Sequence, residues 1–354
     1  MKSKIDLNDK FISFLDQVKD EEPKSLTHLN DRVLIVDGLN TFIRAFAVNP
    51  ATNDDGMHIG GVVGFLRSVR YTCDILKPSR CIIVFDGKGG SVRRRKLYPE
   101  YKANRKVKKR FNRNIKWGTA PQDEEESMKQ QMGRLINYLE YLPLTLISVD
   151  GIEADDTMAY ISQQLLPESD CILMSTDKDF LQLVDDRVKV WSPTKKKLYT
   201  KDVIQEEFGI PSRNMLTYRI LDGDKSDNIG GVQGAGLKSL IKYIPELTED
   251  KDFTAMDLLN FVENTDSKIK LLENIKKCSN IIKRNYLLMQ LQKVDIPKHT
   301  MRKIQGALSR DIPSLVKYKF QTMFLKDKLQ SSIKNLDSWL MEFTRLDRFR
   351  GLKK

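Results

Sequence analysis

The sequence predicts an α/β fold in which a mostly parallel sheet is flanked by helices and followed by a helical C-terminal region. Short apolar runs rich in Val and Ile, such as VLIV and CIIVF, are typical of strands buried in a parallel sheet. Segments of helical periodicity separate these runs, as expected when helices connect parallel strands. From Pro211 onward the pattern is helical only, so the sheet is expected to end before that residue.

The elements follow one another in a regular order along the chain. The buried strands are expected at residues 31–36, 80–85, 144–149 and 171–175. A late hairpin or a pair of edge strands is expected at residues 188–191 and 197–200. The helices between strands are expected at residues 60–76, 128–141, 155–166 and 180–183. Pro78 ends the first of these helices, because proline cannot continue one.

Composition restricts the class of protein. The chain has 354 residues, which allows about two domains with a sizeable core. No run approaches the roughly 20 apolar residues of a membrane span. The N-terminus carries acids throughout and lacks the apolar core of a signal peptide. The four cysteines show no metal-ligand spacing and indicate a reducing compartment. We expect a cytoplasmic protein with no membrane partner.

Carboxylates follow the predicted strands. They are Asp37, Asp86, Glu153, Asp155, Asp156, Asp177 and Asp179. Taken singly, each has an ordinary explanation as a turn residue or helix cap, and Glu153, Asp155 and Asp156 also suit a helix N-terminus. Because parallel strands end at one shared edge, however, these side chains are expected to meet. An all-oxygen cluster suits Mg²⁺ or Mn²⁺, and two such ions are the usual apparatus for phosphodiester hydrolysis.

A long basic segment, residues 88–126, interrupts the α/β pattern. Between Arg93 and Lys116 there are 12 Lys or Arg residues and one acid, Glu100. The segment is too charged for a core and too long for an ordinary connection, so we expect a helical arch. A solvated loop without function is the alternative. Four aromatic residues interleave with the cations and favour nucleic-acid binding. They are Tyr98, Tyr101, Phe111 and Trp117.

Residues 222–240 read DGDKSDNIGGVQGAGLKSL and combine two features. Asp224 and Asp227 add carboxylates within reach of the predicted metal crevice. The glycines that follow have the pattern of a helix–hairpin–helix, whose backbone N–H groups bind phosphate without reading bases. When the glycines are considered alone, a loop with special dihedral angles is the favoured explanation. Beside the acidic strand ends, the phosphate-binding interpretation is favoured.

The motifs VDGLN, FDG, YPEYKANR, GIEADD, STDKDF and GDKSDNIGGVQGAG occur in this order. Over roughly residues 31–245 the chain resembles the flap endonuclease or 5′-3′ exonuclease family. The resemblance implies a PIN-like sheet, a basic helical arch and a C-terminal helix–hairpin–helix domain. Within the family, VKVWSPTKKKLY and the chain length are most similar to the ribonuclease H group of T-even-type bacteriophages. The domains implied are 1–30 (extension), 31–210 (catalytic), 211–300 (DNA-binding) and 301–354 (C-terminal helices).

The resemblance also implies roles for individual residues. The first metal site would comprise Asp37, Asp86, Glu153 and Asp155, with Asp156 as a neighbour or outer-shell ligand. The second metal site would comprise Asp177, Asp179, Asp224 and Asp227. Lys102 would contact the scissile phosphate, with Arg105 steadying the same group and Tyr101 as a stacking neighbour. The 5′ strand would be guided by Arg93, Arg94 and Arg95. The duplex backbone would be gripped by Gly231, Gly234, Gly236 and Lys238.

The activity implied is structure-specific 5′ nuclease action on DNA and RNA–DNA hybrids by two Mg²⁺ ions, removing RNA primers and flaps during replication and repair. Expected substrates are 5′ flaps, nicks and ends. We expect a monomer whose C-terminal region contacts a sliding clamp or a single-strand-binding protein, in a host bacterial cytoplasm if phage-encoded. The chain departs from the family where some relatives have Pro in place of Gly231, and in the 30 residues before the first strand. The basic tail fits DNA binding, partner binding or a solvated end equally well.

Two rival classes remain. One is a non-catalytic protein that binds DNA structures, which would be expected to have lost several carboxylates. The other is an RNA-processing nuclease, which leaves the basic arch and the helix–hairpin–helix pattern unexplained. A nucleotide-binding α/β enzyme is a poor fit, because no Gly-rich phosphate loop follows the first strand.

Overall fold

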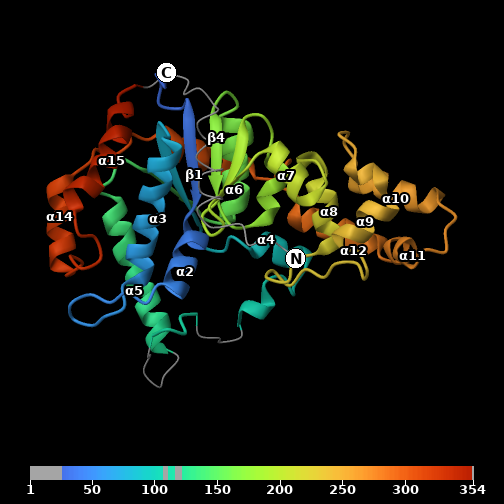
Figure 1. Cartoon of the computed structure of the whole chain (residues 1–354), viewed down its shortest axis with the longest axis horizontal. Helices are drawn as coiled ribbons and strands as arrows, with labels where there is room; N and C mark the ends of the chain where they lie inside the picture. Colours follow the sequence, from blue (N-terminus) through green and yellow to red (C-terminus); the bar gives the residue numbers. More distant parts are fainter. Residues whose placement is uncertain (1–25, 107–110, 116–121, 353–354) are drawn as a thin grey trace, which may run out of the picture.

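The computed structural model describes residues 26–106, 111–115 and 122–352 (Figure 1). Most of the predicted N-terminal extension therefore lies outside the described residues. Within the described part of the chain, no helix is both long and apolar enough to cross a membrane.

A six-stranded sheet forms the centre of the protein. Its strands are β1 (Arg32–Asp37), β2 (Arg80–Asp86), β3 (Thr145–Val149), β4 (Asp170–Met174), β5 (Val188–Ser192) and β6 (Lys197–Tyr199). Their order is β3-β2-β1-β4-β5-β6, and all neighbours are parallel except β5 and β6. The predicted fold class is confirmed, including the late antiparallel hairpin.

The strand order creates a switch point beside β1. The chain runs outward from β1 through β2 to β3 and then returns to place β4 on the other side of β1. Connections on the two sides of such a point diverge, leaving a crevice at the carboxyl edge of the sheet. The C-terminal ends of β1 to β4 all face this edge, because these strands are parallel.

Alternating side chains of β1 enter two separate cores. Val33 and Ile35 belong to the core beneath α6 (Ala154–Tyr160), whereas Leu34 and Val36 belong to the core beneath α3 (Gly60–Leu76). Successive residues of a strand point to opposite faces, so a sheet covered on both faces needs an unbroken apolar run. This explains why the strands could be recognised from VLIV-type runs.

The C-terminal helices α14 (Lys317–Lys326) and α15 (Leu336–Phe349) pack against the α3 side of the sheet (Figure 1). The ring of Phe320 lies 5.0 Å from that of Tyr138 on α5 (Gln122–Leu139), measured between centroids. The carboxylate of Asp327 accepts from Arg134 Nε at 2.7 Å and from the Tyr138 hydroxyl at 2.7 Å. Helices near the C-terminal end of the described chain thus share one core with α3, α5 and Leu34 of β1. The boundary at residue 301 stays a prediction.

A helical region lies at the opposite side of the molecule from α14 (Figure 1). It contains α8 (Met215–Asp222), α9 (Leu237–Tyr243), α10 (Ala255–Asn264), α11 (Lys270–Lys277) and α12 (Ser279–Met289). The sheet connects to it through α7 (Lys201–Phe208), and α13 (Lys298–Ser309) returns from it to β3. The helical character expected after Pro211 is confirmed.

The basic segment leaves β2 through α4 (Val92–Leu97) and a 3₁₀ turn, Ala103–Lys106. It reaches α5 through the described residues 111–115. Helix α5 begins at Gln122, about a turn and a half before the predicted start. Asp123, Glu124 and Glu125 occupy its first turn, where negative charge favours the helix dipole. The acidic patch predicted to close the arch is therefore the start of a helix.

Candidate metal centre

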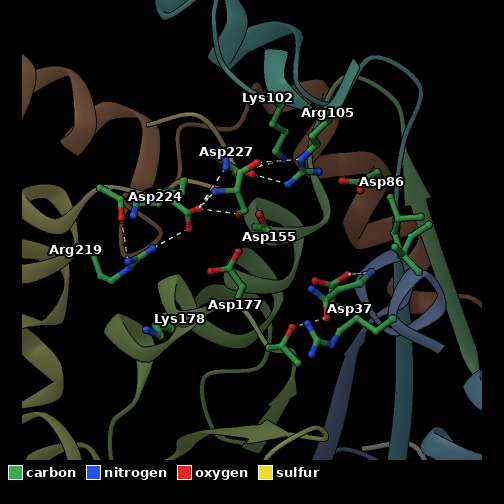
Figure 2. Close-up of a pocket in the computed structure, with 18 of the residues that line it drawn as sticks. Asp37, Asp86, Lys102, Arg105, Asp155, Asp177, Lys178, Arg219, Asp224 and Asp227 are labelled. Carbon is green, nitrogen blue, oxygen red and sulfur yellow. Dashed lines mark hydrogen bonds and ion pairs between the residues drawn. The ribbon is translucent and has the colours of Figure 1, made fainter. Parts of the chain in front are cut away.

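The strand ends and the loop after α8 enclose a cavity of about 1010 Å³ at the carboxyl edge of the sheet. Figure 2 shows Asp155 and Asp177 between Asp37 on one side and Asp224 on the other. Six of the predicted metal ligands line this cavity. They are Asp37, Asp86, Asp155, Asp177, Asp224 and Asp227. Carboxylates separated by up to 190 positions are thus brought together, as the parallel strand ends predicted.

Asp37 both caps a helix and lines the cavity. It ends β1 and caps α2 (Gly38–Val48), accepting a hydrogen bond from Asn40 N at 3.0 Å on Oδ1. The Ser175 hydroxyl donates to its other oxygen at 3.3 Å. Burial, together with the nearby charge of Asp86, raises the pKa of Asp37 to about 6. Asp37 is therefore both the cap of α2 and a buried carboxylate close to a second one.

Asp177, Asp179 and Asp224 form the tightest group, with one oxygen of each within 4.8 Å of the others. The backbone N–H of Asp179 donates to Asp177 Oδ1 at 2.8 Å, which fixes the turn after β4. Burial, together with the nearby charge of Asp179, raises the pKa of Asp177 to about 8. Three crowded carboxylates of this kind suit a hard divalent cation.

The buried cation Arg219 partly neutralises this group, and the sequence analysis missed it. Its Nε donates to Asp179 Oδ1 and its Nη2 to Asp224 Oδ2, both at 2.8 Å. Arg219 lies on α8, five residues before Asp224 in the run MLTYRILD. An arginine inside an otherwise apolar helical run was the available signal.

Asp155 faces the cavity, but Asp156 does not. Burial, followed by the charges of Asp37 and Asp177, raises the pKa of Asp155 well above its usual value. Asp156 bonds the Arg94 guanidinium at 2.9 and 3.0 Å and is buried. Successive residues of a helix project about 100° apart, so the Asp156 side chain leaves the helix in a different direction from that of Asp155. The role of Asp156 as a neighbour or outer-shell ligand of the first metal site stays a prediction.

Arg94 corrects one expectation. Its guanidinium is buried and contacts Glu153, Asp156 and the carbonyl oxygen of Leu288 on α12, the last at 2.8 Å. A side chain held in this way cannot guide a DNA strand, and it instead ties α4 to the helical region. Arg93, half-buried, lies 3.5 Å from Asp156, whereas Arg95 is exposed and available. Glu153 does not line the cavity, and Arg94 and Lys102 lower its pKa although burial opposes them.

The base of the arch rests on the loop after α8. The backbone N–H of Lys102 donates to Asp227 O at 2.9 Å, and the Arg105 guanidinium contacts the Asp227 carboxylate. Lys102 has a φ of 58°, and its ammonium contacts Glu153. Lys102 and Arg105 both line the cavity, as predicted. Tyr101 is 2% exposed, and the Lys102 ammonium lies 4.9 Å from the centroid of its ring. Its role as a stacking neighbour stays a prediction.

The glycine-rich turn lies beside this loop and leads into α9. Gly231 is required by packing, since an added Cβ would lie 2.3 Å from Asp222 O. Gly234 has a φ of 86°, which glycine adopts readily. Gly236 precedes α9 with a φ of −69°, and an added Cβ would meet nothing within 4 Å. Lys238, on the first turn of α9, is exposed.

Arg44 is a further residue that the sequence analysis missed. It lies on α2, lines the cavity and is exposed. The sequence analysis assigned no helix after VDGLN, so it offered no reason to place this side chain at the strand ends. A cation here faces the same space as Lys102 and Arg105.

Comparison with known proteins agrees with this geometry. Residues 32–209 match the family described as "5′-3′ exonuclease, N-terminal resolvase-like domain". The chain is 31% identical over 226 residues to a 5′-3′ exonuclease of Bacillus subtilis, covering 61% of this chain and 71% of the relative. It is 28% identical over 279 residues to a 5′-3′ exonuclease of Buchnera aphidicola, covering 76% and 88%.

Among solved structures, the fold is similar to that of a bacteriophage T5 flap endonuclease in a pseudo-enzyme–product complex with DNA and metal ions. The TM-score is 0.60 at 23% identity, covering 84% of this chain and 100% of the T5 chain. The fold and the carboxylate-lined cavity define a structure-specific nuclease with a PIN-like domain. The chain belongs to the flap endonuclease or 5′-3′ exonuclease family.

Proposed function

We propose that the chain is a Mg²⁺-dependent 5′ nuclease that hydrolyses phosphodiesters in DNA and RNA–DNA hybrids with two metal ions. The observation that carries this proposal is the convergence of six carboxylates with Lys102 and Arg105 on one cavity. Carboxylates alone would suit any divalent cation site. Cations across the same cavity add a place for the charge of a phosphate.

The side chains present fit a pair of hard cations. All the candidate ligands are carboxylate oxygens, which Mg²⁺ and Mn²⁺ prefer. One ion would be held by Asp37, Asp86 and Asp155, and the other by Asp177, Asp179 and Asp224. Bound cations of this kind activate water and stabilise the charge of the leaving oxygen. The pKa values of Asp37 and Asp177 are raised because each carboxyl is buried near another acid. A bound cation would neutralise the negative charge that these groups carry when ionised.

Other side chains of the cavity and the glycine-rich hairpin would bind the substrate. Lys102 and Arg105 would contact the non-bridging oxygens of the scissile phosphate, since both lie at the cavity and are held over it by Asp227. The hairpin around Gly234 and Gly236 would hold duplex backbone, so that recognition depends on shape and not on base sequence. Passage of a free 5′ end past the basic segment would give 5′ polarity.

Removal of RNA primers and flaps during replication is the biological role that we propose. The described DNA and metal complex of the T5 relative supports the substrate class. We also propose that the chain acts as a monomer and that residues 301–354 contact a sliding clamp or single-strand-binding protein.

The decisive experiment uses 5′-labelled flap, nicked and RNA–DNA hybrid substrates, with Mg²⁺, with Mn²⁺ and with EDTA. Cleavage at the junction or from the 5′ end, only with metal, is the expected result. If the protein binds all the substrates but cleaves none of them with either Mg²⁺ or Mn²⁺, the non-catalytic alternative is favoured. Relative rates on hybrid and flap would separate primer removal from flap removal.

A further inference from the structure

The wall of the cavity formed from α2 differs in chemistry from the acidic wall. Leu39 and Ile43 of α2 line it, together with Phe111 from the basic segment. Phe111 is 49% exposed and belongs to neither hydrophobic core. Core packing therefore does not explain why this aromatic ring faces a cavity that cations also line.

The residue after Phe111 explains how the ring is held there. Asn112 is fully buried, and its side-chain amide donates to Phe46 O at 2.8 Å and Asn49 O at 3.1 Å. These carbonyls lie at the C-terminal end of α2, where helical backbone oxygens lack partners. The backbone N–H of Asn112 donates to Glu124 Oε1 at 2.7 Å. Asn112 therefore fixes the basic segment to both α2 and α5.

A wider polar network supports this anchor. Gln131 of α5 accepts from Gly61 N at 2.9 Å and donates to His58 O at 2.8 Å, so that it caps α3 and holds the preceding loop. The His58 ring approaches Asn112 Nδ2 at 3.4 Å. Networks of buried, satisfied polar groups give a rigid and specific arrangement. This hydrogen-bond network thus holds the backbone next to Phe111 in place at the cavity.

We propose that Phe111 is a stacking platform for one base of the single strand that enters the cavity. The inference rests on the proposed nuclease function, and it names the subsite that receives a nucleobase. Phosphates of that strand have Lys102, Arg105 and Arg44 at the same cavity, while its bases need an apolar or aromatic surface. Such stacking tolerates every base, because each has a π-face, and so it fits an enzyme that selects structure.

The test compares Phe111→Ala, Phe111→Leu and Phe111→Trp on a 5′-flap substrate. Phe111→Ala is expected to lower kcat/KM roughly 5- to 140-fold, the range of one lost base–aromatic stack. Phe111→Trp should retain activity and Phe111→Leu should not, because stacking needs a ring. Tyr318→Ala removes an aromatic side chain that is 77% exposed on α14, far from the cavity, and should leave the rate unchanged.

A substrate-side series identifies the contact. Flaps with a single abasic site at successive positions should show one position at which wild type loses activity and Phe111→Ala loses no more. Asn112→Ala should show the same defect as Phe111→Ala, and the variant that carries both changes should be no worse than either one. If Asn112→Ala fails to fold, the Phe111 series alone decides. The inference would be overturned if wild type cleaves and the kcat/KM of Phe111→Ala lies within twofold of the wild-type value. It would also be overturned if no such abasic position is found. A wild-type protein that cleaves nothing would instead overturn the proposed function.

Discussion

The Arg219 guanidinium lies 2.8 Å from the carboxylate of Asp224 and, through a second nitrogen, 2.8 Å from that of Asp179. These acids come from the loop after α8 and the turn after β4, so one arginine joins the helical region to the sheet. It offsets part of the repulsion in the acidic group without occupying the space between the carboxylates. Helix α8 thereby helps to assemble a site that combines carboxylates from the loop after it with carboxylates that follow the strands.

Replacing Arg219 by Met should therefore destabilise the protein and disturb the metal site. Removing one member of a buried ion pair leaves uncompensated charge and costs about 3–5 kcal/mol. The variant should also need more Mg²⁺ for half-maximal activity. Thermal unfolding and a Mg²⁺ titration measure both effects. The matched control is Arg213→Met, which loses exposed pairs with Asp250 and Asp252 and should cost at most about 1 kcal/mol. Equal losses in the two variants would contradict the assignment.

Asp155→Asn and Asp86→Asn should each lower cleavage by more than about 100-fold while duplex binding persists. Each change removes a charged ligand atom from the cavity but leaves the basic segment and hairpin intact. Cleavage rates on a 5′ flap and affinity in a filter or fluorescence assay separate the two effects. Asp54→Asn, in an exposed loop, is the control and should behave as wild type. Near-normal cleavage by either cavity variant would refute the metal assignment.

Stability without metal should fall as pH rises. Burial raises the pKa of Asp37 to about 6 and that of Asp177 to about 8. Both carboxyls therefore bind protons more tightly when folded than when unfolded. Their stabilising contribution is complete below about pH 4 and is lost as pH rises through about 6 and then about 8. Cations bind the ionised forms, so added Mg²⁺ should raise the melting temperature more at about pH 8 than at about pH 5.

The control for this pH dependence is Asp177→Asn. It should remove the upper part of the pH-dependent loss, between about pH 6 and pH 8, and leave the lower part from Asp37. Melting curves in EDTA across this range provide the measurement. A metal-free stability that is flat, or that rises over the same range, would show that these acids are not buried as described.

Two glycines of the hairpin should differ in how much an alanine substitution destabilises the protein. Gly231→Ala places a methyl group against Asp222 O and should cost more than about 1 kcal/mol of unfolding free energy. Gly236→Ala meets no atom and has a compatible φ, but Gly236 is the N-cap of α9, where Ala is less favourable than Gly, so the change should cost less than about 1 kcal/mol. If duplex backbone approaches Gly236, the same variant should bind duplex more weakly. Unfolding and binding measured on both variants decide whether Gly236 serves folding or DNA.

Salt dependence offers a separate check on Lys238. If this exposed side chain contacts a phosphate, Lys238→Gln should weaken binding equally for all sequences. The slope of log K against log salt should become shallower by about 0.9. Titrations of a duplex across a salt series give this slope. Unchanged slopes would remove Lys238 from the interface.

The sheet and the position of its acids were predictable because their signals are local. A strand buried on both faces is an unbroken apolar run, and an Asp at its end marks the carboxyl edge. Helices α2 and α7 were missed although their start signals were present. Asp37 was interpreted as a ligand although it also caps α2, and the cap Thr200 was assigned to a strand.

The burial of arch-base residues could not be predicted, since it depends on distant partners. Arg94 is buried by Leu288, which is 194 positions away, and Tyr101 contacts Asp227, which is 126 positions away. A basic, aromatic sequence gives no sign of which of its side chains fold inward. Asn112 shows the same limit, because its partners on α2 and α5 become neighbours only in the folded protein.

The packing of α14 and α15 on α3 and α5 has a consequence for the order of folding during synthesis. Trp339, Phe343 and Leu346 complete a core that begins with Leu34. A nascent polypeptide ending near residue 300 would leave that apolar surface open to water, and such surfaces attract chaperones and aggregate. The α3 side of the sheet therefore stays partly uncovered until α14 and α15 have been synthesised, although the carboxylates of the cavity are translated earlier.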